Sequence, residues 1–407
     1  MTASQKIVIV GAGFAGMWAA LSAARKLDLA SKADGSVEII LIAPEPVLYI
    51  RPRLYEVDVS TASAPLTDLL AAAGVRYVQG TVQEILVERN ILEYVSADGN
   101  TSTLAFDRLV LASGSKLFRP ETVPGLAEYS LDADQMENAL KFSAHLKSLA
   151  AMPDSPARNT VVVCGGGFTG MEIAAEMPQR LHGILGEKVD VKVIVLERAD
   201  AIGPDMGAKP RPVIEEALTS LGVDILPNQT VVSIDAEGVT TASGTRIASK
   251  TVIWTAGMRA SDLTAQIPAD RDSLGRLFVT QNLKVIGVDN VFATGDTAHV
   301  STGDDEGHLT LMSCQHAMNL GKSAGNNAAA DLLGLPQAPY HQPYYATCLA
   351  LGPWGALFTL GWDREVSLVR EEGHKMKTQI NTQLIYPPPP IRAEALAAAD
   401  PSKLLIG

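Results

Sequence analysis

The chain has 407 residues, which is too long for one ordinary domain and fits two or three. Hydrophobic residues make up 47% of it and charged residues 19%, a balance typical of soluble globular proteins. The formal net charge of −12 argues against a nucleic-acid partner, because phosphate binding needs a basic face, and it disfavours strong attraction to an anionic membrane.

The N-terminal segment and the cysteines favour a reducing compartment. The first residues are polar and run straight into a strand pattern, so we expect no signal peptide. No apolar run reaches the roughly 18 residues that suggest a transmembrane helix. Cys164, Cys314 and Cys348 are far apart and odd in number, so they form neither a disulfide framework nor a zinc-ligand pattern. We therefore expect a cytoplasmic protein without a metal site.

The first predicted unit is a strand, a glycine-rich turn, a helix and a second strand. Residues 6–10 have a buried-strand pattern, Gly11-Ala-Gly-Phe-Ala-Gly16 follows, and a helical pattern runs to about Lys26 before a strand at Val37–Ile42. The first glycine permits the bend, the second lets the backbone approach a pyrophosphate, and the third lets helix pack on strand. Phosphate then binds the unpaired N–H groups at the helix N-terminus. The pattern predicts a dinucleotide site.

A second unit repeats this pattern after proline clusters near residues 120–125 and 152–156. Thr160–Cys164 is the strand, Gly165-Gly-Gly-Phe-Thr-Gly170 is the turn, a helix opens at Met171, and Val191–Leu196 is the next strand. A single glycine motif is weak evidence, but two in the right strand-to-helix context imply two dinucleotides.

An acid at the end of the second strand of each unit would accept hydrogen bonds from the ribose hydroxyls. Glu197 stands there in the second unit and favours NADH, although Arg198 beside it is suited to a 2′-phosphate. In the first unit Ala43 occupies the expected position, with Glu45 two residues later. Either Glu45 reaches the ribose or the backbone alone holds the adenosine.

The C-terminal third continues with further elements. Residues 271–298 have a strand pattern that ends in Val291-Phe-Ala-Thr-Gly-Asp296, and Ser313–Leu333 is predicted to be a helix. Aromatic, glycine and β-branched residues predict an antiparallel module over Tyr340–Arg370. Pro387–Pro390 ends it, and the remaining residues are predicted to be a loose tail.

These motifs, in this order, resemble those of the two-dinucleotide-binding flavoproteins. The likeness rests on both glycine turns and on the segments Leu109-Val-Leu-Ala-Ser-Gly-Ser115, Thr251-Val-Ile-Trp-Thr-Ala-Gly257 and Val291-Phe-Ala-Thr-Gly-Asp-Thr-Ala298. Within that superfamily the chain looks most like the type II NADH:quinone oxidoreductases and the apoptosis-inducing-factor-like reductases. Arg51-Pro-Arg-Leu-Tyr-Glu56 and Met312-Ser-Cys-Gln-His-Ala-Met318 add to that likeness.

The resemblance implies an α/β fold with two Rossmann-type (three-layer ββα) dinucleotide-binding domains, the NAD(P) domain being inserted in the FAD domain. Residues 1–120 and 271–335 would form the FAD-binding domain and residues 121–270 the NAD(P)H-binding domain. Residues 336–407 would form a small C-terminal α+β module and a tail.

The resemblance also implies the cofactor contacts. Asp296 would accept from the FAD ribityl hydroxyls, Val82 would contact adenine through its backbone, and the helix that starts near Gln315 would aim at the flavin. The expected FAD contacts are Gly11, Gly13, Phe14, Ala15, Gly16, Glu45, Arg51, Val82, Ser113, Gly114, Asp296, Gln315, His316 and Ala317. The expected NAD contacts are Gly165, Gly167, Phe168, Thr169, Gly170, Glu197, Ala256 and Gly257.

The implied activity is hydride transfer from NADH to the flavin, followed by electron transfer to a quinone-like small molecule. Glu172 faces the nicotinamide by resemblance, or is only an acid favoured near a helix N-terminus. Gln315 matches the first residue of a Gln-rich segment in quinone-reducing relatives, whereas Asn319 and Leu320 replace the later glutamines. The segment around Lys377 is too short for an in-plane membrane helix, so we expect at most peripheral contact with the inner face of a membrane.

Three alternatives remain open from the sequence. A soluble flavoprotein reductase would feed a protein electron acceptor, and a sulfide:quinone oxidoreductase-like enzyme would need a redox pair of Cys314 and Cys348. A signalling protein would use slow NADH oxidation as a switch. A homodimer is compatible with each of them.

Overall fold

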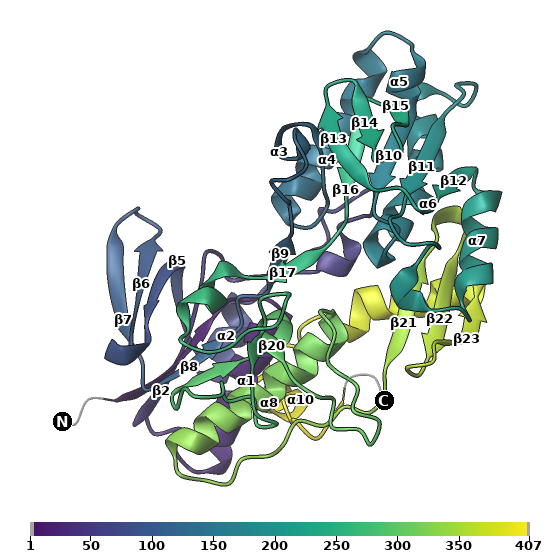
Figure 1. Cartoon of the computed structure of the whole chain (residues 1–407). Coiled ribbons are helices and arrows are strands. Elements are labelled where there is room, and N and C mark those ends of the chain that lie inside the picture. Colours follow the sequence, from purple (N-terminus) through teal and green to yellow (C-terminus); the bar gives the residue numbers. More distant parts are fainter. Residues whose placement is uncertain (1–3, 405–407) are drawn as a thin grey trace.

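The structure, a computed structural model, describes residues 4–404, in which two parallel sheets form the centres of two lobes (Figure 1). The first sheet has the strand order β19-β8-β1-β2-β5-β6-β7. Its strands are β1 (Gln5–Val10), β2 (Val37–Ala43), β5 (Arg76–Leu86), β6 (Ile91–Ser96), β7 (Thr101–Ala105), β8 (Arg108–Leu111) and β19 (Val291–Ala293). The strands from β19 to β5 pair in parallel, whereas β5, β6 and β7 pair antiparallel. Helices α1 (Phe14–Leu29), α2 (Thr67–Ala73) and α8 (Cys314–Leu332) belong to this lobe.

The second sheet has the order β12-β11-β10-β16 and is parallel throughout. Its strands are β10 (Thr160–Cys164), β11 (Lys192–Leu196), β12 (Val223–Leu226) and β16 (Thr251–Trp254). An antiparallel sheet of β13 (Val231–Asp235), β14 (Gly238–Thr241) and β15 (Arg246–Ala248) lies in the same lobe. The helices of this lobe are α3 (Leu126–Tyr129), α4 (Met136–Ser148), α5 (Pro156–Asn159), α6 (Phe168–Leu185) and α7 (Arg211–Ser220). The central strands are buried on both faces, as parallel strands covered by helices are.

The chain crosses between the lobes twice, and the two crossings pair with each other. Strand β9 (Ser115–Leu117) leaves the end of β8, and β17 (Met258–Ala260) leaves the end of β16. They form an antiparallel ribbon in which Met258 lies opposite Leu117. Short pairs of β3 (Val47–Tyr49) with β4 (Ser63–Pro65), and of β18 (Leu277–Phe278) with β20 (Ala298–His299), complete the first lobe.

The C-terminal module is antiparallel, as the sequence pattern predicted. Strands β21 (Ala346–Ala350), β22 (Ala356–Leu360) and β23 (Glu365–Val369) form its sheet. Helix α9 (Arg370–Gln379) and a π-helical turn (Ile380–Leu384) follow. The sheet packs against α6 of the second lobe, beside α7 in Figure 1.

The prediction of a loose tail is wrong for the residues up to 404. Helix α10 (Arg392–Ala398) packs on α1 and α2, far from the C-terminal module that precedes it (Figure 1). Arg392 donates to the carbonyl oxygens of Ala72 and Ala73 at the end of α2, at 3.4 and 2.8 Å. Arg25 and Asp400 form an ion pair at 2.6 Å. The proline run ends one element, but it places no restriction on a helix that begins beyond it.

Helices α1 and α8 are in backbone contact along one face. A Cβ atom added to Gly321 would lie 2.3 Å from the carbonyl oxygen of Ala15, and one added to Gly325 would lie 2.0 Å from that of Ala19. Residues four apart share a helix face, so both glycines are needed at this contact. The close approach holds the N-terminus of α8 beside that of α1. Within residues 4–404, none of the helices combines the length and the apolar character needed to cross a bilayer.

This contact gives a stability prediction. Gly325→Ala should lower the free energy of unfolding by about 1–3 kcal/mol, because the added methyl group overpacks the α1–α8 interface. Gly183→Ala is the matched control, since Gly183 lies in α6 and a Cβ there would meet no described atom within 4 Å. The control should gain up to about 1 kcal/mol from better helix propensity. Urea unfolding of both variants measures the difference, and equal stabilities would contradict the packing.

Candidate functional site

The first glycine turn follows β1 and has the geometry of a phosphate cradle. Gly11 has φ +110°, and a Cβ on it would lie 2.5 Å from the carbonyl oxygen of Ala112. A Cβ on Gly16 would lie 1.9 Å from the carbonyl oxygen of Gly11, so this glycine allows helix α1 to pack on the turn. Gly13 is different, because no described atom lies within 4 Å of its added Cβ. No side chain within residues 4–404 caps α1, which leaves its first N–H groups for a ligand.

The second turn, after β10, repeats this geometry. Gly165 has φ +115°, and its added Cβ would lie 3.1 Å from the nitrogen of Ala256. Gly170 would meet the carbonyl oxygen of Gly165 at 1.9 Å, whereas Gly167 again faces open space. Helix α6 has no side-chain cap among the described residues, like α1. Phe168 is half-buried and Thr169 is exposed at the start of α6, whereas Phe14 and Ala15 are buried at the start of α1.

The acids after the second strands differ between the two lobes. Glu197 is buried at the end of β11, and its carboxylate accepts from the N–H groups of Gly166 and Ala199, both at 2.7 Å. It thus lies against the second glycine turn, while the adjacent Arg198 is exposed. Glu45 is exposed beyond β2 and accepts from the hydroxyl of Tyr49, a contact that raises the pKa of that phenol to about 12. A role of Glu45 toward a ribose stays a prediction.

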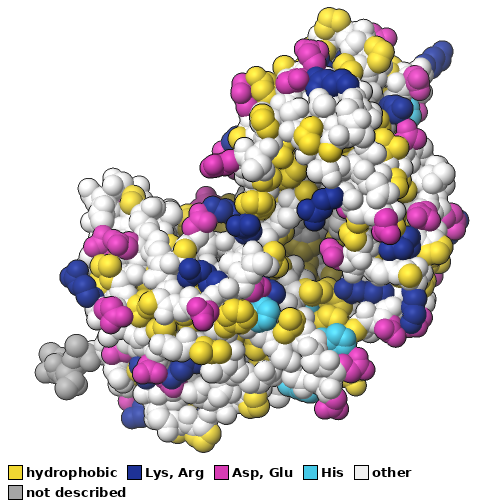
Figure 2. All heavy atoms as spheres, viewed as in Figure 1, with side chains coloured by type: hydrophobic (Ala, Val, Ile, Leu, Met, Phe, Trp, Pro, Cys, Tyr) yellow, Lys and Arg dark blue, Asp and Glu magenta, His cyan; other side chains and the backbone are white. Residues whose placement is uncertain are grey.

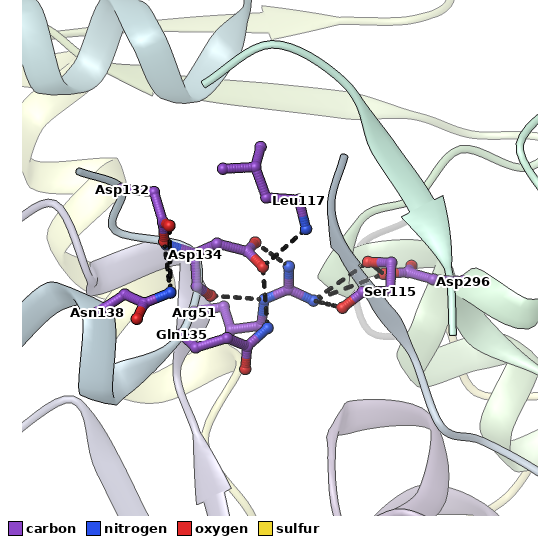
Figure 3. A network of polar contacts seen from close by, with 8 residues as sticks. All are labelled: Arg51, Ser115, Leu117, Asp132, Asp134, Gln135, Asn138 and Asp296. Carbon is purple, nitrogen blue, oxygen red and sulfur yellow. Dashed lines mark hydrogen bonds and ion pairs between the residues drawn. The ribbon is translucent and has the colours of Figure 1, made fainter. Parts of the chain in front are cut away.

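Asp296 lies in a polar network between the lobes (Figure 3). It follows β19 and accepts from the hydroxyl of Ser115 at 2.5 Å. Arg51 is ion-paired with Asp134 and also lies 3.8 Å from Asp296, so its guanidinium bridges two carboxylates. Asp134 in turn accepts from the backbone N–H of Leu117, on the crossing strand β9, at 3.1 Å. No sequence motif pointed to Asp134, because its partners come from distant segments.

The remaining predicted residues of the first lobe lie in the link after β8 and within β5. Ser113 and Gly114 link β8 to β9, where Gly114 has φ +67° and the hydroxyl of Ser113 is buried without a hydrogen-bond partner among residues 4–404. Val82 lies half-buried in β5, opposite Tyr94. In the second lobe, Ala256 and Gly257 occupy the equivalent link between β16 and β17.

The first turn of α8 carries unpaired hydrogen-bond donors. Ser313 caps this helix by accepting from the N–H of His316 at 3.3 Å. The side-chain oxygen Oε1 of Gln315 accepts from the N–H of Ala346 at 3.4 Å, while the buried side-chain nitrogen Nε2 has no partner among the described residues. Ala317 is buried on the same turn, where its side chain lies within 3.5 Å of a Cβ added to Gly295.

His316 is fully buried, and its ring also presents an unpaired donor. The N–H of Leu311 donates to Nδ1 at 3.2 Å, which assigns the ring proton to Nε2. Nε2 is buried and has no hydrogen-bond partner within residues 4–404. Burial, together with the nearby charges of Arg364 and Arg276, lowers the pKa of His316 to about 3. The ring is therefore neutral at physiological pH.

Glu172 forms a buried ion pair that the sequence did not reveal. Its carboxylate accepts from Lys377 Nζ at 2.7 Å and from the N–H of Ala350 at 3.0 Å. Lys377 lies on α9 and also donates to the carbonyl oxygen of Cys348 at 2.9 Å. Burial raises the pKa of Glu172, against the opposing effect of the ammonium group. Lys377 is only 6% exposed, so this part of α9 faces the second lobe rather than the surface.

The three cysteines carry free thiols. Burial raises the pKa of Cys314 and that of Cys348 to about 11, so both are protonated at neutral pH. A thiolate is the reactive form of cysteine, and a reactive pair has no support in this environment.

A cavity of about 390 Å³ opens between the start of α8 and the C-terminal module. Apolar side chains dominate its walls, and Gln315 contributes the polar group. The residues that matter for its chemistry are Gln315, Tyr345, Ala346, Phe358, Leu360 and Gly361. Figure 2 shows that this face of the molecule is hollowed between the two lobes, with basic side chains on the rim.

Two Rossmann-like parallel sheets joined by paired crossing strands make up the fold of the two-dinucleotide-binding flavoprotein reductases. The chain belongs to the pyridine nucleotide-disulphide oxidoreductase family, which it matches over residues 5–321. The fold class and the oxidoreductase class that the sequence predicted are therefore confirmed.

Curated relatives and solved structures agree with this placement. An NADH dehydrogenase-like protein of Mycobacterium tuberculosis is 44% identical over 97% of this chain and 98% of its own length. A demethylphylloquinone reductase of Synechocystis sp. is 30% identical over 88% of this chain and 87% of its own. The structure of NDH2 from Plasmodium falciparum in complex with NADH matches with a TM-score of 0.77 at 16% identity, covering 98% of this chain and 97% of that one. At that identity the structural match shows the fold alone.

The buried His316 gives a pH prediction. Its pKa of about 3 in the folded protein lies below the ordinary 6.5, so the unfolded chain binds more protons between these values. Stability should therefore fall as the pH drops below about 6.5, and His316 should account for about 2 kcal/mol between pH 7 and pH 5. Urea unfolding at both pH values should show that His316→Gln loses about 2 kcal/mol less stability than the wild type when the pH falls from 7 to 5. If the variant and the wild type lost the same stability, the burial of His316 as a neutral ring would be contradicted.

Proposed function

We propose that this protein is an FAD-dependent NADH dehydrogenase that passes electrons to a quinone-like small molecule. The observation that carries the proposal is that the carboxyl-terminal edges of the two sheets are linked by paired strands. Both glycine turns lie at carboxyl ends of parallel strands, and the links Ser113–Gly114 and Ala256–Gly257 lead from the same edges into β9 and β17. Because β9 and β17 pair with each other, nucleotides held at the two turns would approach one another at this crossing.

The first turn fits FAD. Residues 1–120 and 271–335 would form its domain, with the pyrophosphate at the uncapped start of α1 beside Gly13. Asp296 and the unpaired hydroxyl of Ser113 would hold the hydroxyl-bearing part of the cofactor. When bound, FAD supplies the chemistry of accepting a hydride and passing its electrons on. The N-terminus of α8 favours negative charge near it.

The second turn fits NADH, held by residues 121–270. Glu197 already accepts two backbone hydrogen bonds, and its remaining acceptor capacity suits the ribose hydroxyls. A 2′-phosphate would lie against this buried carboxylate. Like-charge repulsion therefore favours NADH over NADPH.

The cavity at the start of α8 fits a flat, largely apolar acceptor. The carbonyl of Gln315 is engaged by Ala346, which leaves its amide N–H groups for an acceptor oxygen. Tyr344 and Leu360 line the cavity and are 66% and 48% exposed, so the mouth of the cavity is apolar as well. A quinone carries hydrogen-bond acceptors on an apolar ring, which matches this wall.

The reaction as a whole consumes NADH, one proton and one quinone and produces NAD⁺ and hydroquinone. One proton must therefore reach the acceptor beyond the hydride. Glu172 has a raised pKa and shares a hydrogen bond with Lys377, so this buried pair is suited to relaying a proton beside the C-terminal module.

An anaerobic titration tests the function. The purified protein should be yellow, should bleach with one equivalent of NADH, and should regain its colour when menadione is added. NADPH should bleach it far less readily. A protein that stays colourless with FAD supplied, or that NADH reduces but no quinone reoxidises, would contradict the proposal.

Substitutions at Gly13 and Gly167, whose added Cβ atoms would face open space, test the two cofactor sites separately. Gly13→Ala should retain the fold but lose FAD, because the methyl group would occupy space that the pyrophosphate needs and no described atom lies there. Gly167→Ala should stay yellow and raise the KM for NADH by about tenfold with little change in kcat, as loss of uniform binding does. The absorbance of the flavin and steady-state kinetics measure both effects. Exchanged phenotypes would reverse the assignment of the two lobes.

A further inference from the structure

Arg364 is a buried cation without a counter-charge. It lies in the turn between β22 and β23 and is 8% exposed. No carboxylate within residues 4–404 pairs with it, and its Nη1 atom is buried without a hydrogen-bond partner in the same range. Both carboxylates next to it in sequence turn away. Asp363 and Glu365 are 85% and 67% exposed at their side chains, and both pair with Lys209 instead.

The backbone at Arg364 is also unfavourable for an arginine. Its φ is +56°, in the left-handed region that residues with a Cβ atom rarely adopt. Burial of a charge without a counter-ion is unfavourable too, because the aromatic ring against the guanidinium replaces only part of the lost hydration. A residue held in such a conformation, with its charge unpaired, is typical of a site that a ligand completes.

The guanidinium lies behind the wall of the acceptor cavity. Its central carbon is 4.4 Å from the centre of the Tyr345 ring, and Tyr345 lines the cavity together with Gly361 of the same turn. The Tyr345 ring is parallel to that of His316 within 5°, at a centroid distance of 5.0 Å. The charge of Arg364 therefore lies against a side chain that forms part of the cavity wall.

The other groups at this wall are donors as well. Gln315 in the wall and His316, which stacks on Tyr345, each present a buried N–H without a partner among the described residues, and the N-terminus of α8 adds its positive dipole end. The next cation, Lys377, is paired with Glu172 and contributes little net charge. The cavity thus has an excess of donors and one uncompensated positive charge, without a negative partner on that wall.

We propose that Arg364 is a specificity-determining residue of the acceptor cavity and that it favours quinone-type acceptors with an ionised oxygen on the ring. The proposal rests on the proposed function of this cavity. A unit charge against a side chain of the cavity wall, in a partly buried site, shifts the affinity for an anion by about tenfold. A neutral quinone of the same size gains much less from it.

Two naphthoquinones of nearly equal shape test this selectivity. 2-Hydroxy-1,4-naphthoquinone is ionised at neutral pH, whereas menadione carries a methyl group in place of the hydroxyl. Quenching of flavin fluorescence in the oxidised holoenzyme measures the Kd of each. We expect the wild type to bind the anion about tenfold more tightly than menadione. Arg364→Asn should remove this preference, because asparagine tolerates the left-handed backbone but carries no charge. Arg364→Lys should keep most of it.

Two controls separate this idea from the alternatives. Lys209→Met removes a cation that pairs with both neighbours of Arg364 but is 46% exposed, and it should leave the preference unchanged. Arg364→Met provides a second neutral variant should the asparagine variant fail to fold. Equal Kd values for the two ligands in the wild type, or a preference that survives in both neutral variants, would overturn the proposal. A change in Kd of equal size for both ligands in the Arg364 variants would also overturn the proposal. Failure of the wild type to pass electrons from NADH to menadione would instead refute the proposed function.

Discussion

The close contact between α1 and α8 is the constraint on which the site depends. At Gly321 and Gly325 the two helices approach so closely that any side chain would meet backbone atoms of Ala15 and Ala19. Ordinary helix pairs are separated by the side chains between them. Gly295, just before Asp296, lies at the same point, since its added Cβ would be 2.8 Å from that of Ala15. Segments separated by about three-quarters of the chain therefore meet within one site.

The site that results presents several hydrogen-bond donors without protein partners among the described residues. Each glycine turn leaves helix N–H groups open, and the start of α8 adds the unpaired nitrogens of Gln315 and His316. Arg364 contributes a positive charge at the far wall of the cavity. Pyrophosphates and quinone oxygens accept hydrogen bonds or carry negative charge, so all the proposed ligands have the complementary chemistry. Unpaired donors and positive charge thus match the negative or hydrogen-bond-accepting groups of both nucleotides and of the acceptor.

Buried charges connect the parts of the molecule that surround the site. Glu172 on α6 and Lys377 on α9 join the second lobe to the C-terminal module, at side-chain exposures of 5% and 8%. Arg51 joins Asp134, ahead of α4, to Asp296 in the first lobe. Removing one partner of such a pair leaves the other charge buried and unpaired, which is more destabilising than the loss of an exposed pair. These contacts make the relative position of the lobes and the module depend on specific residues.

The two glycine turns, the strands that precede them, the helices that follow and the class of fold could all be predicted from the amino-acid sequence. Local backbone geometry is the reason, because Gly11 and Gly165 adopt φ values of +110° and +115°, and Gly16 and Gly170 pack against the first glycine of their own turn. Tertiary packing alone sets the partner of Glu172, which is 205 residues away, and the docking of α10. It likewise decided that Arg364 is buried without a partner while its acidic neighbours face solvent. No periodicity or motif encodes these features, since each depends on which distant surfaces the folded chain brings together.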